Sequence, residues 1–171
     1  MRLTIRAKLV LLSLPILVVV SFGFMLFQQR LSRGWVEEDL RERAIVFARE
    51  MAATIGDRRE FESGELLARQ IGQIMDVRPS VLQLDVLAFD ATGSRVMATS
   101  HPLSRLPVTR RDADQVRRGR AVSRLVDAER ARYWEVVAPV ALDGGVVGAV
   151  AAKFSLARAD ALAARIGTAA L

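Results

Sequence analysis

The sequence predicts an α+β fold in which a transmembrane helix and a long helix precede a domain with about five antiparallel strands in one sheet and a C-terminal helix. Three observations support this prediction. Residues 9–27 form an uncharged apolar run, residues 35–75 repeat apolar side chains at helical spacing, and later segments alternate with a period of two between turn motifs. A length of 171 residues suits one domain plus a membrane anchor.

The charge of the chain is concentrated at its N-terminus. The net charge is +6, but residues 1–35 contain five basic residues and no acidic one, so the other 136 residues carry 20 basic and 19 acidic side chains. The sequence pI of about 11.0 therefore reflects the N-terminus. A nucleic-acid partner is not expected.

Few residues are available for catalysis or metal binding. The chain has no cysteine and one histidine, His101, which excludes disulfides, thiolate zinc sites and a cysteine nucleophile. Asp85 and Asp90 are expected on a strand and its turn, so they do not form a carboxylate pair, and no nucleophile motif or phosphate loop is present. We expect no catalytic residue and no metal site.

The first element is predicted to cross a membrane. Residues 9–27 hold 19 uncharged residues, which as a helix span roughly the 30 Å hydrocarbon core. A cleavable signal peptide is the alternative, but no small-x-small site follows Phe27, so an uncleaved anchor is favoured. Basic residues before the run and acidic residues 37–39 after it predict a cytoplasmic N-terminus, with the chain outside the membrane after about residue 30.

Two helices are predicted next. Apolar residues spaced by three or four positions indicate a helix continuing from the anchor, with Gly34 as its only local breaker and Gly56-Asp57 as its end. The face concerned contains Leu40, Ala44, Phe47, Met51 and Ile55, and we expect it to mediate dimerisation. Ser63 is a plausible N-cap of a second helix that ends at Arg78-Pro79.

Strands and turns follow Pro79. Residues 81–89 alternate as a strand with one buried face, a turn at residues 90–93 leads into a second arm at 95–99, and His101-Pro102 begins a loop. Thr109 and Asp112 fit the capping box of a short helix reaching Gly119. A further strand is predicted at 121–126.

A second hairpin has the strongest local signal. Residues 133–140 and 146–154 flank Asp143-Gly144-Gly145, a sequence suited to a tight turn with positive φ. Pro139 is typical of a sheet edge or a bulge. Ser155 is predicted to cap a last helix that continues to Leu171.

This order resembles the extracytoplasmic PAS-like sensor domains, called Cache or PDC domains, of bacterial transmembrane receptors, above all sensor histidine kinases. The resemblance rests on the motifs at residues 89–96, 99–102, 119–120, 136–140 and 145–150. It implies a ligand-binding domain between two membrane helices, followed inside the cell by a kinase that uses ATP and Mg and phosphorylates a response regulator. None of that output is present in these 171 residues.

The resemblance also implies domain boundaries. They are a cytoplasmic N-terminus at 1–8, a transmembrane helix at 9–27, a sensor domain at 30–155 and a C-terminal helix at 156–171 that leads towards a missing second transmembrane helix. The chain is thus interpreted as the sensory fragment of a receptor in the bacterial cytoplasmic membrane. A homodimer is expected, with a shift between its first and last helices as the signal.

In this family the ligand lies against the sheet, under the connection between strands. That connection, residues 105–132, holds nine arginines and four acidic residues, a net of +5, which favours an anionic ligand such as an organic acid. The alternative is a solvated arginine surface, or one facing lipid headgroups. The candidate ligand-binding residues are Arg95, His101, Arg120, Arg132, Tyr133 and Trp134.

The resemblance does not extend to ligand specificity. Sensor kinases for citrate and dicarboxylates carry basic residues four and two positions before the proline of this hairpin, whereas this chain has Glu135 and Val137 there. Ala98 similarly replaces a basic residue three positions before His101. Alternative outputs are a chemoreceptor or a cyclic-dinucleotide enzyme, and an alternative role is an anchored envelope scaffold without a ligand.

Overall fold

The computed structural model describes residues 5–90, 93–128, 131–157 and 161, without the side chains of residues 5–13, 25–26 and 28–36. The chain divides into two compact units, Met1–Glu38 and Asp39–Leu171. Each unit is described by itself.

Helix α1 (Ile5–Thr54) begins in the first unit and ends in the second, and it includes Pro15 without interruption. The predicted continuity through Gly34 is therefore confirmed. In the first unit, the described large apolar side chains are each more than half exposed: Leu14, Ile16, Leu17, Val18, Val19, Val20, Phe22, Phe24 and Phe27. Within the described residues, no helix has the length and apolar character needed to span a membrane.

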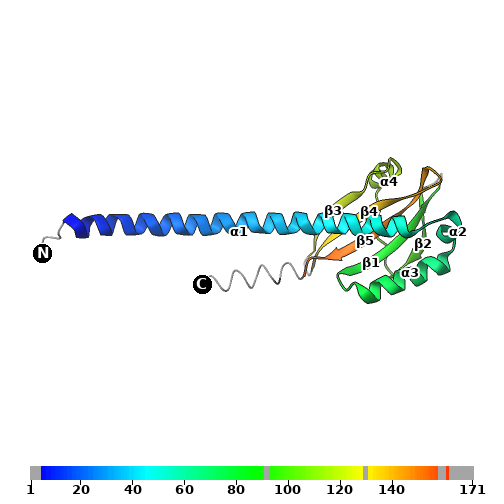
Figure 1. The fold of residues 1–171 in the computed structure, drawn as a ribbon, viewed down its shortest axis with the longest axis horizontal. Coiled ribbons are helices and arrows are strands. Elements are labelled where there is room, and N and C mark those ends of the chain that lie inside the picture. The colour runs from blue at the N-terminus through cyan, green and yellow to red at the C-terminus, as the bar shows by residue number, and fades with distance from the viewer. Residues whose placement is uncertain (1–4, 91–92, 129–130, 158–160, 162–171) are drawn as a thin grey trace. The chain divides into compact units, whose positions relative to one another are not determined.

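The second unit is built on one antiparallel sheet. Its strands are β1 (Val81–Phe89), β2 (Ser94–Thr99), β3 (Val122–Ala128), β4 (Ala131–Leu142) and β5 (Gly145–Ser155). Their spatial order is β2-β1-β5-β4-β3 (Figure 1). The predicted α+β class and five-stranded antiparallel sheet are confirmed.

Local side-chain chemistry sets the turns and helix ends where the sequence predicts them. Asp143 and Gly144 both have positive φ, 53° and 78°, in the β4–β5 turn. Ser63 caps α3 (Gly64–Val77) by accepting a hydrogen bond from the Leu66 amide. Thr109 and Asp112 form the predicted capping box of α4 (Arg110–Arg117). The single-turn helix α2 (Arg58–Glu62), capped by Asp57, was not predicted because five residues carry no readable periodicity.

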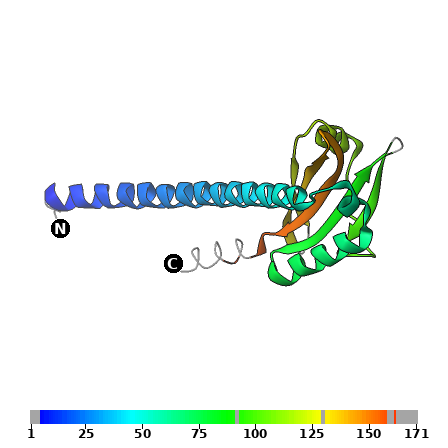
Figure 2. The ribbon, with the colours of Figure 1, turned by 45° about the vertical axis from the view of Figure 1, so that its right-hand side comes forward.

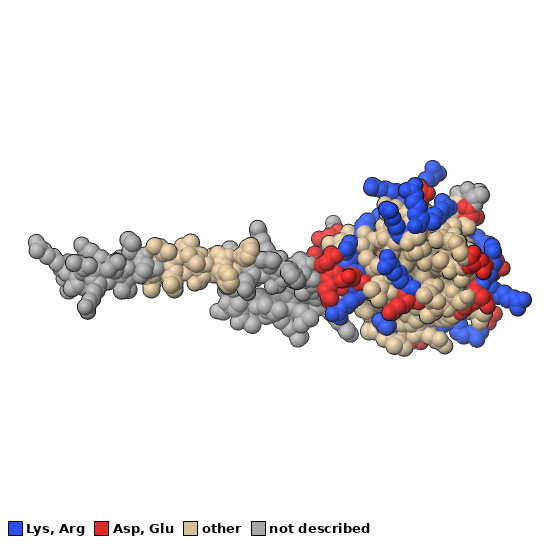
Figure 3. All heavy atoms as spheres, turned by 45° about the horizontal axis from the view of Figure 1, so that its top comes forward, with Lys and Arg blue, Asp and Glu red and all other residues tan. Residues whose placement is uncertain are grey.

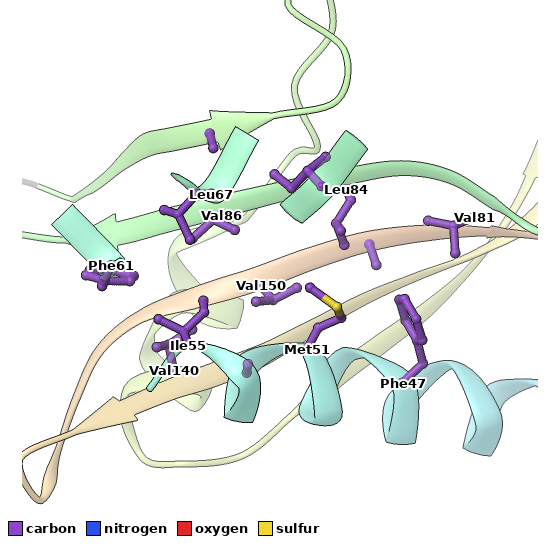
Figure 4. Packing of buried hydrophobic residues seen from close by; sticks show 14 of the residues in the cluster. Phe47, Met51, Ile55, Phe61, Leu67, Val81, Leu84, Val86, Val140 and Val150 are labelled. Carbon is purple, nitrogen blue, oxygen red and sulfur yellow. The ribbon is translucent and has the colours of Figure 1, made fainter. Parts of the chain in front are cut away.

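One face of the sheet is covered by the end of α1 together with α2 and α3. Phe47 and Met51 of α1, Phe61 of α2 and Leu67 of α3 pack with the strand residues that point to this side, including Val150 (Figure 4). The Phe47 ring meets the Phe154 ring edge-on, with centroids 5.3 Å apart. We call this face the α1 side.

This packing corrects the predicted dimerisation face. Phe47 and Met51 are each only 7% exposed, and Ala44 is 2% exposed, because they form the core of their own domain. A side chain already buried against its own sheet is not available to a second copy. The periodicity located the apolar face of α1 correctly, but the prediction of its partner was wrong.

The opposite face is crossed by the connection between β2 and β3. These are the two edge strands, so residues 100–121 must traverse the whole width of the sheet. Helix α4 lies in this connection, and its Val116 packs with Leu87, Val137 and Ala149. Figures 1 and 2 show α4 on one side of the sheet and α3 on the other. We call this second face the α4 side.

Because both faces of the sheet are covered, the prediction that β1 buries only one face is wrong. Leu84 and Val86 belong to the α1-side core, while Gln83, Asp85 and Leu87 are at most 5% exposed on the α4 side. Alternation in the sequence cannot show a second buried face when polar residues occupy it.

Pro139 lies in the interior strand β4, at a position where that strand is paired on one side only, as an edge strand is. β3 pairs with β4 only as far as Val122–Val137, so on the β3 side β4 has no partner strand at Pro139. The predicted C-terminal helix lies mostly outside the described residues. Before it, Ser155 Oγ accepts a hydrogen bond from the Ala157 amide at 3.1 Å.

Gly148 provides a test of how closely the α1 side is packed. A Cβ at this position would collide with the Leu87 carbonyl oxygen and lie 2.5 Å from Phe61 Cζ. We expect Gly148→Ala to lower the free energy of unfolding by about 3 kcal/mol, measured by urea denaturation of the full chain.

The matched control is Gly72→Ala in α3, where an added Cβ has no neighbour within 4 Å. Because alanine favours helix more than glycine, this change should raise the free energy of unfolding by about 0.5–1 kcal/mol. Equal effects of the two substitutions would contradict the close approach of Phe61 to β5.

Candidate functional site

Four polar side chains form a row across the α4 side of the sheet. Gln83 of β1 pairs with Lys153 of β5, which pairs with Glu135 of β4, which in turn pairs with Arg124 of β3. Residues paired across antiparallel strands point to the same face. We call these four residues the polar row.

A small pocket lies between the polar row and the crossing connection. Arg124 and Glu135 line it from the sheet, while Leu106 and Pro107 line it from the connection and Asp112 from the first turn of α4. Its volume is about 20 Å³, which is room for roughly one water molecule. This volume is too small to enclose an amino acid or an organic acid.

The pocket contains an ion pair between its two charged strand residues. Arg124 Nη2 donates to Glu135 Oε2, and Arg124 Nε donates to the same oxygen at 3.2 Å. The Glu135 side chain is 11% exposed and the Arg124 side chain 46% exposed. The hydrogen bond to Glu135 raises the pKa of Arg124 above its ordinary value, although burial acts in the other direction.

A second cation lies on the other side of Glu135 in the row. Lys153 Nζ is 3.7 Å from the centroid of the Tyr133 ring, a cation–π contact that holds the ammonium group over the sheet. Two cations therefore flank one carboxylate. This arrangement can bind a carboxylate at either cation and a ligand amine at Glu135.

The predicted ligand residues are distributed over both faces. Tyr133 lies on the α4 side, two residues from Glu135 on the same strand. By strand alternation, Trp134 and Arg132 lie on or towards the α1 side, where Trp134 packs with Ala44 and Ala48.

The other three predicted residues lie apart from the pocket lining. Arg95 pairs with Ala88, which packs on the α1-side core, so Arg95 points away from the pocket. His101 and Arg120 are exposed at the two ends of the crossing connection. The role of all six in ligand binding stays a prediction.

Sequence reasoning missed the polar row itself. Lys153 is the one charged residue of β5, and Glu135 lies between apolar residues of β4, whereas β3 carries both Arg124 and Asp127. That pattern is a detectable signal, because a charge at an inward position of a covered strand needs a partner. Strand order and register were needed to show that the three charges are neighbours.

The arginine-rich connection forms an exposed basic surface around α4. Figure 3 shows lysine and arginine side chains gathered over the part of the domain that carries α4. Within the described part of the chain, five of these arginines have no side-chain hydrogen bond or ion pair: Arg105, Arg110, Arg111, Arg118 and Arg120. Arg117 differs, since it donates to the carbonyl oxygens of Asp90 and Gly93, each at 3.1 Å.

The fold is similar to that of a solved ligand-binding domain. No protein-family profile matches the chain, and no curated protein matches it. Among solved structures, the ligand-binding domain of the Pseudomonas aeruginosa PAO1 amino acid chemoreceptor PctC, in complex with GABA, is similar with a TM-score of 0.53 and 15% identity. The match covers 80% of this chain and 61% of that one, so this chain spans less than two thirds of the PctC domain. At 15% identity the likeness shows a shared fold, and the family membership that the sequence resemblance implied stays a prediction.

A double-mutant cycle tests the pairing of Arg124 with Glu135. Because Arg124 is partly exposed, we expect a coupling of about 0.5–1 kcal/mol between Arg124→Gln and Glu135→Gln. The measurement is the free energy of unfolding of the wild type, both single variants and the double variant. Additive effects would show that the two side chains do not interact.

Proposed function

We propose that this chain is the sensory input region of a membrane-bound two-component sensor histidine kinase, and that it binds a small ligand outside the cytoplasmic membrane. The observation that carries the proposal is a pocket with paired charges, lying between the sheet and its crossing connection in a fold shared with a ligand-binding domain. The region itself binds and transmits, and any catalysis belongs to an output domain.

The proposed ligand is a small organic acid, which can also carry an amine. Arg124 offers a planar guanidinium to a carboxylate, Lys153 offers a second cation and Glu135 can accept from an amine. The PctC domain binds GABA, which carries both groups. A ligand carboxylate would compete with Glu135 for Arg124.

The proposed signal passes through β4 and β5. Glu135 faces the pocket, while its neighbours Trp134 and Val136 face the other way and pack with Ala44 and Ala48 of α1. A shift of β4 at the pocket therefore moves the surface on which α1 rests. Close-packed contacts transmit such displacements because they leave few voids.

The proposed location is the bacterial cytoplasmic membrane, with residues 9–27 as the anchor, the N-terminus in the cytoplasm and the sensor domain outside. One support is the 19-residue uncharged run. A second is that the described large apolar side chains between Leu14 and Phe27 are each 58–70% exposed. Apolar side chains exposed around a whole helix are typical of contact with lipid.

We further propose a homodimer and a kinase output, with ATP and Mg bound by the kinase core and a response regulator as its partner. Dimerisation through α1 would use its outward side, which carries the 48% exposed Val46. The likeness to a chemoreceptor domain favours a chemoreceptor as the second candidate output. A cyclic-dinucleotide enzyme or an anchored scaffold without a ligand are the other candidates.

Ligand binding is testable by a thermal-shift screen of the full chain against GABA, other amino acids and dicarboxylates. At 100 times its Kd, a ligand should stabilise the domain by about 2.7 kcal/mol, and Arg124→Gln should abolish most of the shift. The control is Arg95→Gln, on the opposite face, which should keep it. Loss of the shift with Arg95→Gln alone would place the site on the α1 side.

Topology is testable because the chain contains no cysteine. A single Val77→Cys, at a position 78% exposed, should react with a membrane-impermeant maleimide in intact bacterial cells. Arg6→Cys should react only after the cells are opened. Labelling of both positions, or of neither, in intact cells would contradict the proposed orientation.

A further inference from the structure

Asp85 is a buried carboxylate with no role in the pocket described above. It is 1% exposed on the α4 side of β1. Thr99 Oγ1 donates to its Oδ1 at 2.6 Å, and the Leu106 amide donates to its Oδ2 at 2.9 Å. Gln83 Nε2 lies 3.1 Å from Oδ2 and 3.3 Å from Oδ1. The carboxylate thus joins the end of β2, the strand β1 and the crossing connection.

Gln83 makes a second tie to the same connection. It is 5% exposed, and its Nε2 donates to the Ser104 carbonyl oxygen at 2.8 Å. The connection leaves the sheet at Ser100, whose amide and hydroxyl both pair with the Leu84 backbone at 2.9 Å. Beyond that point, the Thr99 hydroxyl of β2 accepts from the His101 amide at 3.0 Å, and Gln83 and Asp85 bind the connection at Ser104 and Leu106.

The segment held by these bonds has little packing of its own. Residues 101–105 are all exposed, and Leu103 is fully exposed at 101%. Only Leu106 and Val108 pack on the α4-side core, and both are partly exposed. In contrast, α4 is anchored independently by the buried Val116 and by the bonds of Arg117 to the β1–β2 turn.

We propose that residues 100–108 are a latch that Asp85 holds closed over the pocket. The inference rests on the proposed function, because Leu106 and Pro107 of the latch cover the pocket that would receive the ligand. With the latch closed, the pocket holds about 20 Å³, too little for an organic acid. Release of the Leu106 amide from Asp85 enlarges the pocket beside Arg124 and Glu135 while α4 stays in place.

An aspartate suits this role better than its amide. A carboxylate has two acceptor oxygens and no donor, so it can serve Thr99, Leu106 and Gln83 together. Asparagine has the same size but only one acceptor oxygen. Its NH₂ group would therefore face one of the donors that now bind Asp85. Asp85→Asn therefore loosens the latch without removing volume from the core.

The first test needs no ligand. In hydrogen–deuterium exchange of the ligand-free full chain in detergent, Asp85→Asn should accelerate exchange in peptides covering residues 101–108 by about tenfold. Peptides from α3 and β5 should be unchanged. The matched control is Asp143→Asn in the exposed β4–β5 turn, where asparagine also tolerates positive φ and no acceleration is expected.

Two results would overturn the latch. One is an unchanged rate at residues 101–108, and the other is equal acceleration in α3 and β5, which would mean general destabilisation. Thr99→Val keeps the side-chain shape and removes the hydroxyl that donates to Asp85 and accepts from the His101 amide. Should Asp85→Asn fail to fold, Thr99→Val decides the question by the same criterion, with a smaller acceleration expected.

The second test links the latch to binding, with GABA as the probe in isothermal titration. If only the open form binds, its apparent Kd falls as the open fraction rises. Asp85→Asn should therefore bind GABA up to about tenfold more tightly, whereas Arg124→Gln binds it more weakly. Unchanged affinity with faster exchange would overturn the latch as a gate. Absence of GABA binding in every variant would count against the proposed ligand, and exchange would then decide the latch alone.

Discussion

The packing of α1 and α3 against one face of β1, β5 and β4 is the interaction on which the rest of this structure depends. It buries Phe47, Met51 and Leu67 and leaves the opposite face as the only large surface of the sheet that the crossing connection can cover. Because β2 and β3 are the two edges, one connection must cross that face completely. The pocket is the space left between this crossing connection and the polar row.

Alternation along β4 and β5 places the proposed ligand contacts and the contacts with α1 on neighbouring residues of the same strands. On β4, Glu135 faces the pocket while Trp134 and Val136 face α1. On β5, Lys153 belongs to the polar row while Phe154 meets Phe47 of α1. No separate relay is needed, since a strand that moves at one face moves at the other.

The polar groups of the α4 side differ in burial. Asp85 and Gln83 are almost fully buried, and each is satisfied within the domain by the crossing connection. Arg124 and Lys153 retain access to solvent, so they can exchange their present partners for those of a ligand. Burial therefore distinguishes the groups that hold the connection from the groups to which the proposed function assigns the ligand.

The sequence by itself determined the elements whose signals are local. These include the capping box of Thr109 and Asp112, the Ser63 cap and the turn at Asp143-Gly144, each set by contacts within a few residues. The apolar face of α1 was likewise visible from its spacing of three and four residues. The family resemblance further implied that the arginine-rich connection adjoins a ligand site, which stays a prediction. Only the tertiary structure decided that Phe47 packs on its own sheet, that Arg124, Glu135 and Lys153 are neighbours, and that Asp85 holds Leu106. Those contacts join residues on different strands, and a side-chain period of two cannot specify which strand lies alongside.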